Sequence, residues 1–138
     1  MLGIQVPYTW HVSLSIGSSV TIRAKPMMSF SLDPQMQVGF HTEANEKSDI
    51  AFHFRVYFGI FVVINSLEGG SWKHEMKSSH MPFVDDQSFD LRMLVLHNEY
   101  QVVANGQHCY GFAHRLQPGC VKMMQIWRDV LLISVDVS

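Results

Sequence analysis

The sequence predicts an all-β fold, either a sandwich or a barrel of antiparallel strands. Strand-length runs of alternating apolar and polar residues recur along the chain, Gly, Pro, Asn and Asp interrupt them at short intervals, and helical periodicity is nearly absent. The 138 residues suffice for one core without metal or disulfide support, and no linker, repeat or charge block divides them. We therefore expect a single domain over residues 1–138.

Residues 36–58 contain the clearest strand patterns. In the first, Met36, Val38 and Phe40 share one face, opposite Gln37 and His41. The second run covers residues 50–58, and its apolar members share one face: Ile50, Phe52, Phe54, Val56 and Phe58. Its other face carries three polar side chains: His53, Arg55 and Tyr57. Both segments are predicted to be half-buried strands.

The second half of the chain continues this pattern. Residues 89–95 form an alternating run, and Asn105-Gly106 separates residues 100–104 from residues 107–112, which predicts a hairpin with a type I′ turn. Asp33-Pro34 and residues 117–119 read as turns, and Pro82 should break or enter a strand. Residues 121–137 contain two strand-like pieces around Arg128-Asp129, which we expect to pair with strands near the N-terminus.

Composition and charge exclude several functional classes. A formal net charge of −2 with 16% charged residues gives no reason to expect a nucleic-acid partner. The longest apolar stretches, residues 60–64 and 130–135, are far shorter than the roughly 20 residues that cross a bilayer. The N-terminus does not resemble a signal peptide, so we expect synthesis in the cytosol. Cys109 and Cys120 are expected to be free thiols, with a disulfide as the alternative.

Signals for catalysis or metal binding are missing from the sequence. It contains no Walker loop, dinucleotide fingerprint, Gly-x-Ser-x-Gly elbow or His-Glu-x-x-His motif. The eight histidines are scattered without paired spacing. We therefore expect no enzyme activity, no metal and no cofactor.

Polar and aromatic residues of the central region suggest a binding site for neutral sugars. His53, Arg55 and Tyr57 project from one strand face, Asn65 ends the next strand, and Trp72 and Glu75 follow a turn. Sugars are bound by planar polar side chains together with an aromatic ring against their C–H groups. Alternation places Trp72 and Glu75 on opposite faces, so their joint action requires a bend near Lys73. Trp10 and Trp127 are predicted to be packing residues.

These residues resemble the galectin sugar-binding signature. His53, Val63-x-Asn65 and Trp72-x-x-Glu75-x-Lys77 occur in the order of the usual His-x-Asn-x-Arg, Val-x-Asn and Trp-Gly-x-Glu-x-Arg motifs. Further similar stretches cover essentially the whole chain: Phe30-x-x-Asp33-Pro34, residues 49–54, Val103-x-Asn105-Gly106 and Phe112-x-His114-Arg115. Residues 56–59, 81–83 and 121–129 look most similar to the single-domain placental and eosinophil (Charcot-Leyden crystal) branch.

The resemblance implies an eleven-stranded jelly-roll β-sandwich of two antiparallel sheets, one of five and one of six strands. It implies that His53 and Asn65 bond galactose-type hydroxyls, that Trp72 stacks on the sugar and that Glu75 orients its neighbours. Lys77 stands where arginine is usual and loses the planar fork of that side chain. Arg55 replaces the usual asparagine and Tyr57 the usual arginine, which changes the donors and acceptors offered to a ligand.

Two functions from different classes are consistent with these residues. The first is a lectin that binds β-galactosides or related glycans of glycoproteins or glycolipids, with altered specificity or weakened lactose affinity. The alternative is a dimeric protein-interaction module with a vestigial sugar site. We expect a homodimer in either case, since exposed strand edges invite pairing of two copies. The resemblance also implies a location in the cytoplasm, with the nucleus as a second compartment, and secretion without a signal peptide.

Overall fold

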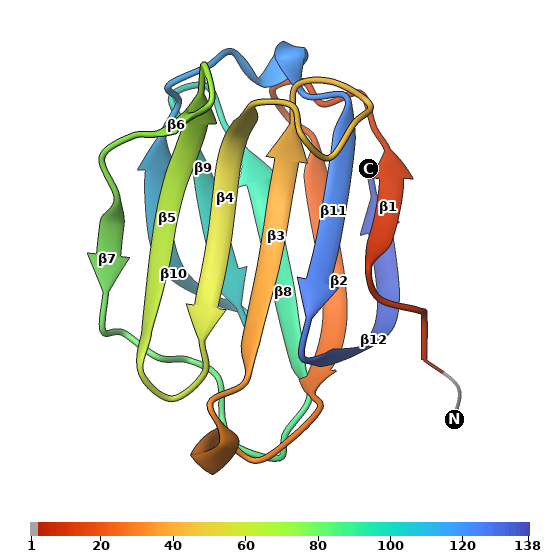
Figure 1. Cartoon of the computed structure of the whole chain (residues 1–138), viewed down its shortest axis with the longest axis vertical. Helices are drawn as coiled ribbons and strands as arrows, with labels where there is room; N and C mark the ends of the chain where they lie inside the picture. The colour runs from red at the N-terminus through yellow and green to blue at the C-terminus, as the bar shows by residue number, and fades with distance from the viewer. Residues whose placement is uncertain (1–2) are drawn as a thin grey trace.

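Two antiparallel β-sheets packed face to face make up the computed structural model, which describes residues 3–138 (Figure 1). One sheet has the order β1 (Tyr8–His11), β11 (Met123–Arg128), β3 (Gln35–His41), β4 (Ile50–Tyr57), β5 (Phe61–Glu68) and β6 (Ser71–Trp72), and β7 (Met76–Ser78) also pairs with β5. The second has the order β10 (Gln107–Ala113), β9 (Glu99–Ala104), β8 (Phe89–Val95), β2 (Ser19–Pro26) and β12 (Val130–Val137). Two short 3-10 helices connect strands: η1 (Phe30–Leu32) and η2 (Pro118–Cys120). The predicted all-β sandwich is confirmed.

The described part of the chain has twelve strands where the resemblance implied eleven. The difference arises at the edge of the seven-stranded sheet, where β6 and β7 pair with β5 one after the other: Trp72 lies opposite Leu67 and Met76 opposite Ile64. Residues 73–75 interrupt the pairing between them. Because β6 and β7 occupy the same edge of β5, this sheet is still six strands wide.

The core lies between the two sheets and is formed by the apolar faces predicted from alternation. Met36, Val38 and Phe40 of β3 are all fully buried, as are their neighbours Phe52, Phe54 and Val56 of β4. Aromatic rings join the sheets at the centre, where the Phe52 and Tyr100 ring centroids lie 4.7 Å apart. Burial of this face turns the polar residues of β3 and β4 toward the outer surface of the seven-stranded sheet.

The predicted turn and the predicted pairing of the C-terminal segment are both confirmed. Asn105 and Gly106 have φ values of 51° and 80°, as a type I′ turn requires. The chain then changes sheets at Arg128, whose φ is 91°. As a result β11 pairs with β1 and β12 pairs with β2, both of which are strands from the N-terminal part of the chain.

The structure of residues 3–138 also describes the cysteines, the arrangement of possible metal ligands and the helices. Cys109 and Cys120 are both free. No group of three or more His, Cys, Asp or Glu side chains in the described range could hold a metal ion. No helix in this range has the length and apolar character needed to span a membrane.

Candidate functional site

Six of the seven predicted site residues line one cavity on the outer face of β4 and β5. This cavity, here called the groove, has a volume of about 320 Å³. The residues that line it are Gln37, His53, Arg55, Tyr57, Val63, Asn65, Trp72 and Glu75. Strand pairing explains this arrangement, since Gln37 lies opposite Arg55 and His53 lies opposite Asn65 in adjacent strands.

His53 forms the buried floor of the groove and is only 6% exposed. Its Nε2 donates to Gln37 Oε1 at 3.0 Å, and its ring centroid lies 4.8 Å from that of Trp72 and 6.0 Å from that of Trp127. Burial lowers the pKa of His53 to about 4, with smaller contributions from the charge of Arg55 and from His41. The imidazole is therefore neutral near pH 7, and its Nε2–H is already used within the protein.

Arg55 and Tyr57 occupy the end of the groove nearest the β4–β5 turn. The Arg55 Nε and Nη2 atoms both donate to Gln35 Oε1, at 3.0 and 2.7 Å, and its Cζ lies 4.8 Å from the centroid of the Tyr57 ring. Tyr57 also packs against Phe61, with ring centroids 4.8 Å apart. The substituted pair is thus held by contacts within the protein, and Arg55 can offer a ligand only donors.

Asn65 is held in one orientation by three neighbours. Its Oδ1 accepts from the Ser66 backbone N–H at 2.8 Å and from Arg115 Nη1 at 3.0 Å, while its Nδ2 donates to the Lys73 carbonyl at 2.9 Å. Exchanging the oxygen and nitrogen of the amide would set N–H groups against two donors, so the assignment follows from the partners. One N–H of Nδ2 remains for a ligand.

Trp72 and Glu75 reach the same cavity because the chain bends between them, as strand alternation requires for their joint action. The bend consists of residues 73–75, where Lys73 N donates to the Ser66 carbonyl at 3.0 Å. Trp72 is 52% exposed and presents an open indole surface. Within residues 3–138 the Glu75 carboxylate makes no hydrogen bond or ion pair, and it is exposed beside the groove.

Lys77 is the predicted residue that does not line the groove. It lies opposite Val63 on the neighbouring strand, and its Nζ lies 4.0 Å from the centroid of the Phe61 ring. This cation–π contact directs the ammonium group toward Phe61.

A second cavity lies beside the groove, and neither this cavity nor the contribution of Trp127 to its lining was predicted from the sequence. It has a volume of about 450 Å³ and is lined by Gln37, His41, His53, Trp72 and Trp127, among others. Trp127, predicted to be a packing residue, therefore faces this cavity, whereas Trp10 does pack against the core. Alternation from buried Ile126 would have placed Trp127 on the outer face, since the two are neighbours in β11.

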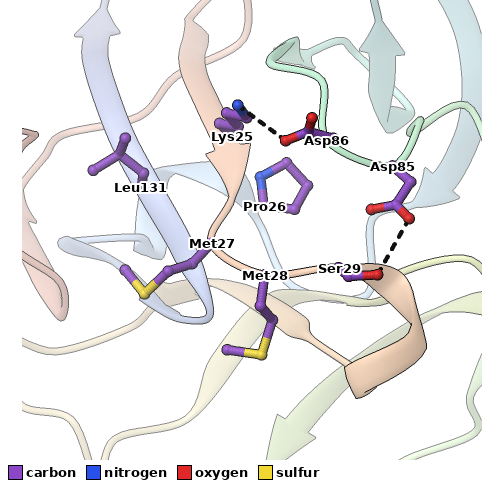
Figure 2. Close-up of a pocket in the computed structure, with 8 residues that line it drawn as sticks. All are labelled: Lys25, Pro26, Met27, Met28, Ser29, Asp85, Asp86 and Leu131. Carbon is purple, nitrogen blue, oxygen red and sulfur yellow. Dashed lines mark hydrogen bonds and ion pairs between the residues drawn. The ribbon is translucent and has the colours of Figure 1, made fainter.

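A larger cavity, of about 600 Å³, contains none of the predicted site residues. It lies where β2 leads into η1, and Figure 2 shows Met27, Met28 and Leu131 on one side and Asp85 and Asp86 on the other. Lys25 Nζ forms an ion pair with Asp86 at 3.2 Å. Asp85 accepts the Phe30 backbone N–H at 3.1 Å, which identifies it as a support for η1.

Known proteins resemble this chain over nearly its whole length. Residues 5–137 match the family model described as galactoside-binding lectin. Human galectin-16 is 51% identical over 98% of this chain and 95% of its own, and human galactoside-binding soluble lectin 13 is 49% identical over 99% of each. The structure of human galectin-16 R55N aligns with a TM-score of 0.95 at 49% identity, covering 100% of this chain and 99% of that one. Sheep galectin-11 in complex with glycerol aligns with a TM-score of 0.92 at 40% identity, covering 98% and 99%.

Proposed function

Because this chain belongs to the galactoside-binding lectin family, the galectins, we propose that its groove binds glycans with a specificity that differs from that for simple β-galactosides. Members of this family are lectins rather than enzymes. The observation that supports the proposal is the gathering of His53, Asn65, Trp72 and Glu75 around one cavity of about 320 Å³. These side chains supply an imidazole, a carboxamide, a carboxylate and an exposed indole, the groups that recognise a sugar ring.

The altered specificity is argued from Arg55 and Tyr57. Arg55 donates hydrogen bonds and cannot accept them, and Tyr57 offers one hydroxyl where the family pattern has several N–H donors. A buried polar group left unpaired costs about 1–3 kcal/mol, so two mismatches weaken lactose binding by roughly two decades or more. Arg55 and the free N–H of Asn65 favour a ligand that presents acceptor oxygens toward β4 and β5.

A panel of immobilised glycans tests this proposal. We expect the wild-type protein to retain at least one glycan more strongly than lactose. The double variant Arg55→Asn/Tyr57→Arg, which restores the family pattern, should gain lactose affinity by at least about tenfold. If the wild-type protein retains no glycan above background and the double variant gains nothing, the lectin proposal is wrong.

A second candidate is a dimeric protein-interaction module with a vestigial sugar site. It is favoured by the internal partners of the altered residues: Arg55 is bonded to Gln35, and Lys77 lies against Phe61. Under this proposal a protein partner replaces the glycan, and binding of that partner survives the loss of Trp72. The glycan panel separates the two candidates.

We also propose a homodimer that pairs through sheet edges. β1 and β12 are edge strands of the two sheets, and Ile4 covers part of β12 through a bond from its N–H to the Leu132 carbonyl at 2.7 Å. Sedimentation that gives the monomer mass at all workable concentrations contradicts this proposal. Residence in the cytoplasm and nucleus, with export that needs no signal peptide, stays a proposal that fractionation of expressing cells and their medium can test.

A further inference from the structure

Arg115 crosses from one sheet to the groove in the other. It follows β10 of the five-stranded sheet, and its Nη1 lies 3.0 Å from Asn65 Oδ1 and 3.1 Å from Ser66 Oγ in β5. Its Nη2 donates to the carbonyl of His74. One guanidinium therefore connects the groove-lining strand β5 with the bend between Trp72 and Glu75.

The Arg115 guanidinium also packs against an aromatic ring of β10. Its Cζ lies 4.6 Å from the centroid of the Phe112 ring. The preceding residue, His114, bonds the Leu96 carbonyl through Nε2 at 2.8 Å and packs edge-on against Tyr100, with ring centroids 4.5 Å apart. The guanidinium thus lies over the Phe112 ring and extends from an anchored backbone, which limits how far it can move.

The bond from Arg115 occupies the second acceptor position of Asn65, whose amide orientation Ser66 and Lys73 already set. Asn65 is 7% exposed, and its Oδ1 receives both the Ser66 N–H and the guanidinium. A carbonyl oxygen has two lone pairs, so both are occupied. The Asn65 Nδ2 uses one hydrogen on the Lys73 carbonyl and has one left for the cavity.

We propose that Arg115 is a positioning residue of the glycan site: it occupies the remaining acceptor position of Asn65, so that Asn65 offers a ligand only a donor, and it holds the bend that presents Trp72 and Glu75. This inference rests on the proposed lectin function, because a positioning role is defined by the ligand it serves. The ligand group that meets Asn65 must then be an acceptor, such as a hydroxyl or carboxylate oxygen.

The chemistry of arginine explains why another cation cannot fully substitute. The planar fork reaches three acceptors at once, namely Asn65 Oδ1, Ser66 Oγ and the His74 carbonyl. A lysine at this position keeps the charge and the stem but presents a single ammonium group. Methionine keeps only the stem. The series arginine, lysine, methionine therefore removes first the fork and then the charge, together with the cation–π contact on Phe112, while an unbranched stem is kept.

The experiment measures glycan affinity and the NMR signals of the Asn65 side-chain amide. These signals are identified by their absence from the spectrum of the Asn65→Asp variant. We expect Arg115→Met to weaken binding of the glycan that the wild type retains by about tenfold or more, and Arg115→Lys to recover part of this loss. The Asn65 amide signals should shift in both variants, most in Arg115→Met. Arg92→Met, at an exposed arginine of β8, is the matched control and should change neither readout.

Several outcomes would overturn the inference. An Arg115→Met protein whose affinity stays within about twofold of wild type, with unmoved Asn65 signals, removes the positioning role. Loss of affinity with unmoved Asn65 signals, and without recovery in Arg115→Lys, would mean that Arg115 only supports the fold. If the methionine variant does not fold, the lysine variant decides by the same two readouts. If the wild type retains no glycan, the lectin proposal fails, and the NMR signals alone still decide whether Arg115 occupies the Asn65 oxygen.

Discussion

Burial of a neutral His53 should make the stability of this protein depend on pH. The folded state holds the pKa of His53 at about 4, whereas the unfolded chain has the ordinary value of 6.5. Between these two values the unfolded state binds the additional proton. The contribution of His53 to stability is therefore complete above pH 6.5 and is lost progressively as the pH falls toward 4.

The size of the effect follows from the difference between the two pKa values. A separation of 2.5 units, from 6.5 to about 4, corresponds to about 3 kcal/mol over the whole window. Between pH 7.5 and pH 5 the same linkage gives a loss of about 2 kcal/mol. The physical cause is burial. His53 is 6% exposed and lies near the indole rings of Trp72 and Trp127, so protonation would place a charge on a ring that is shielded from water.

Urea unfolding at pH 7.5 and pH 5 measures this difference. We compare the wild type with His53→Gln, which keeps a polar side chain and removes the titration, and with His108→Gln at an exposed histidine of β10. The wild type and the His108 variant should lose about 2 kcal/mol more than His53→Gln between the two pH values. If all three proteins show the same pH dependence, His53 is not held neutral by burial, and the description of the groove floor is wrong.

Two further substitutions test the groove and the hairpin. Trp72→Ala should weaken glycan binding by about 10- to 100-fold. It should change the free energy of unfolding by only about 1 kcal/mol, because the indole is half exposed. The control is Trp10→Phe, at a residue that packs against the core, which should leave glycan affinity unchanged. Equal affinity of Trp72→Ala and wild type would contradict the stacking role. Gly106→Val should destabilise the protein by about 1–3 kcal/mol in thermal unfolding, because its φ of 80° is strained for a branched side chain. Gly119→Ala, in open space without positive φ, should be neutral, and equal melting of the two variants would contradict this account.

Alternation along β4 was sufficient to predict its two faces. The five apolar residues predicted to share one face, from Ile50 to Phe58, are all buried, and His53, Arg55 and Tyr57 of the other face all line the groove. The Asn105-Gly106 turn was equally predictable, because few residues other than glycine and asparagine tolerate positive φ. Such features depend on neighbouring residues in the chain, so a single sequence contains the information they need.

Contacts between distant residues could not be predicted in this way. Arg115 and Asn65 are 50 residues apart, and nothing in either local pattern indicates that they meet. The bonds from Arg55 to Gln35 depend on the register between β3 and β4. The break between β6 and β7 likewise depends on two hydrogen bonds between Lys73 and β5: Lys73 N–H donates to the Ser66 carbonyl, and Asn65 Nδ2 donates to the Lys73 carbonyl.

Local chemistry thus determined the strands, their buried faces, the tight turn and the types of side chain offered to a ligand. Those properties follow from backbone geometry, which repeats every two residues along a strand. Only the tertiary structure decided that a cavity forms beside Trp127, that Lys77 turns toward Phe61 and that the oxygen of Asn65 is already occupied. The physical reason is that a hydrogen bond or an aromatic contact needs its partner within a few ångströms, and the packing of two sheets brings those partners together from distant parts of the chain.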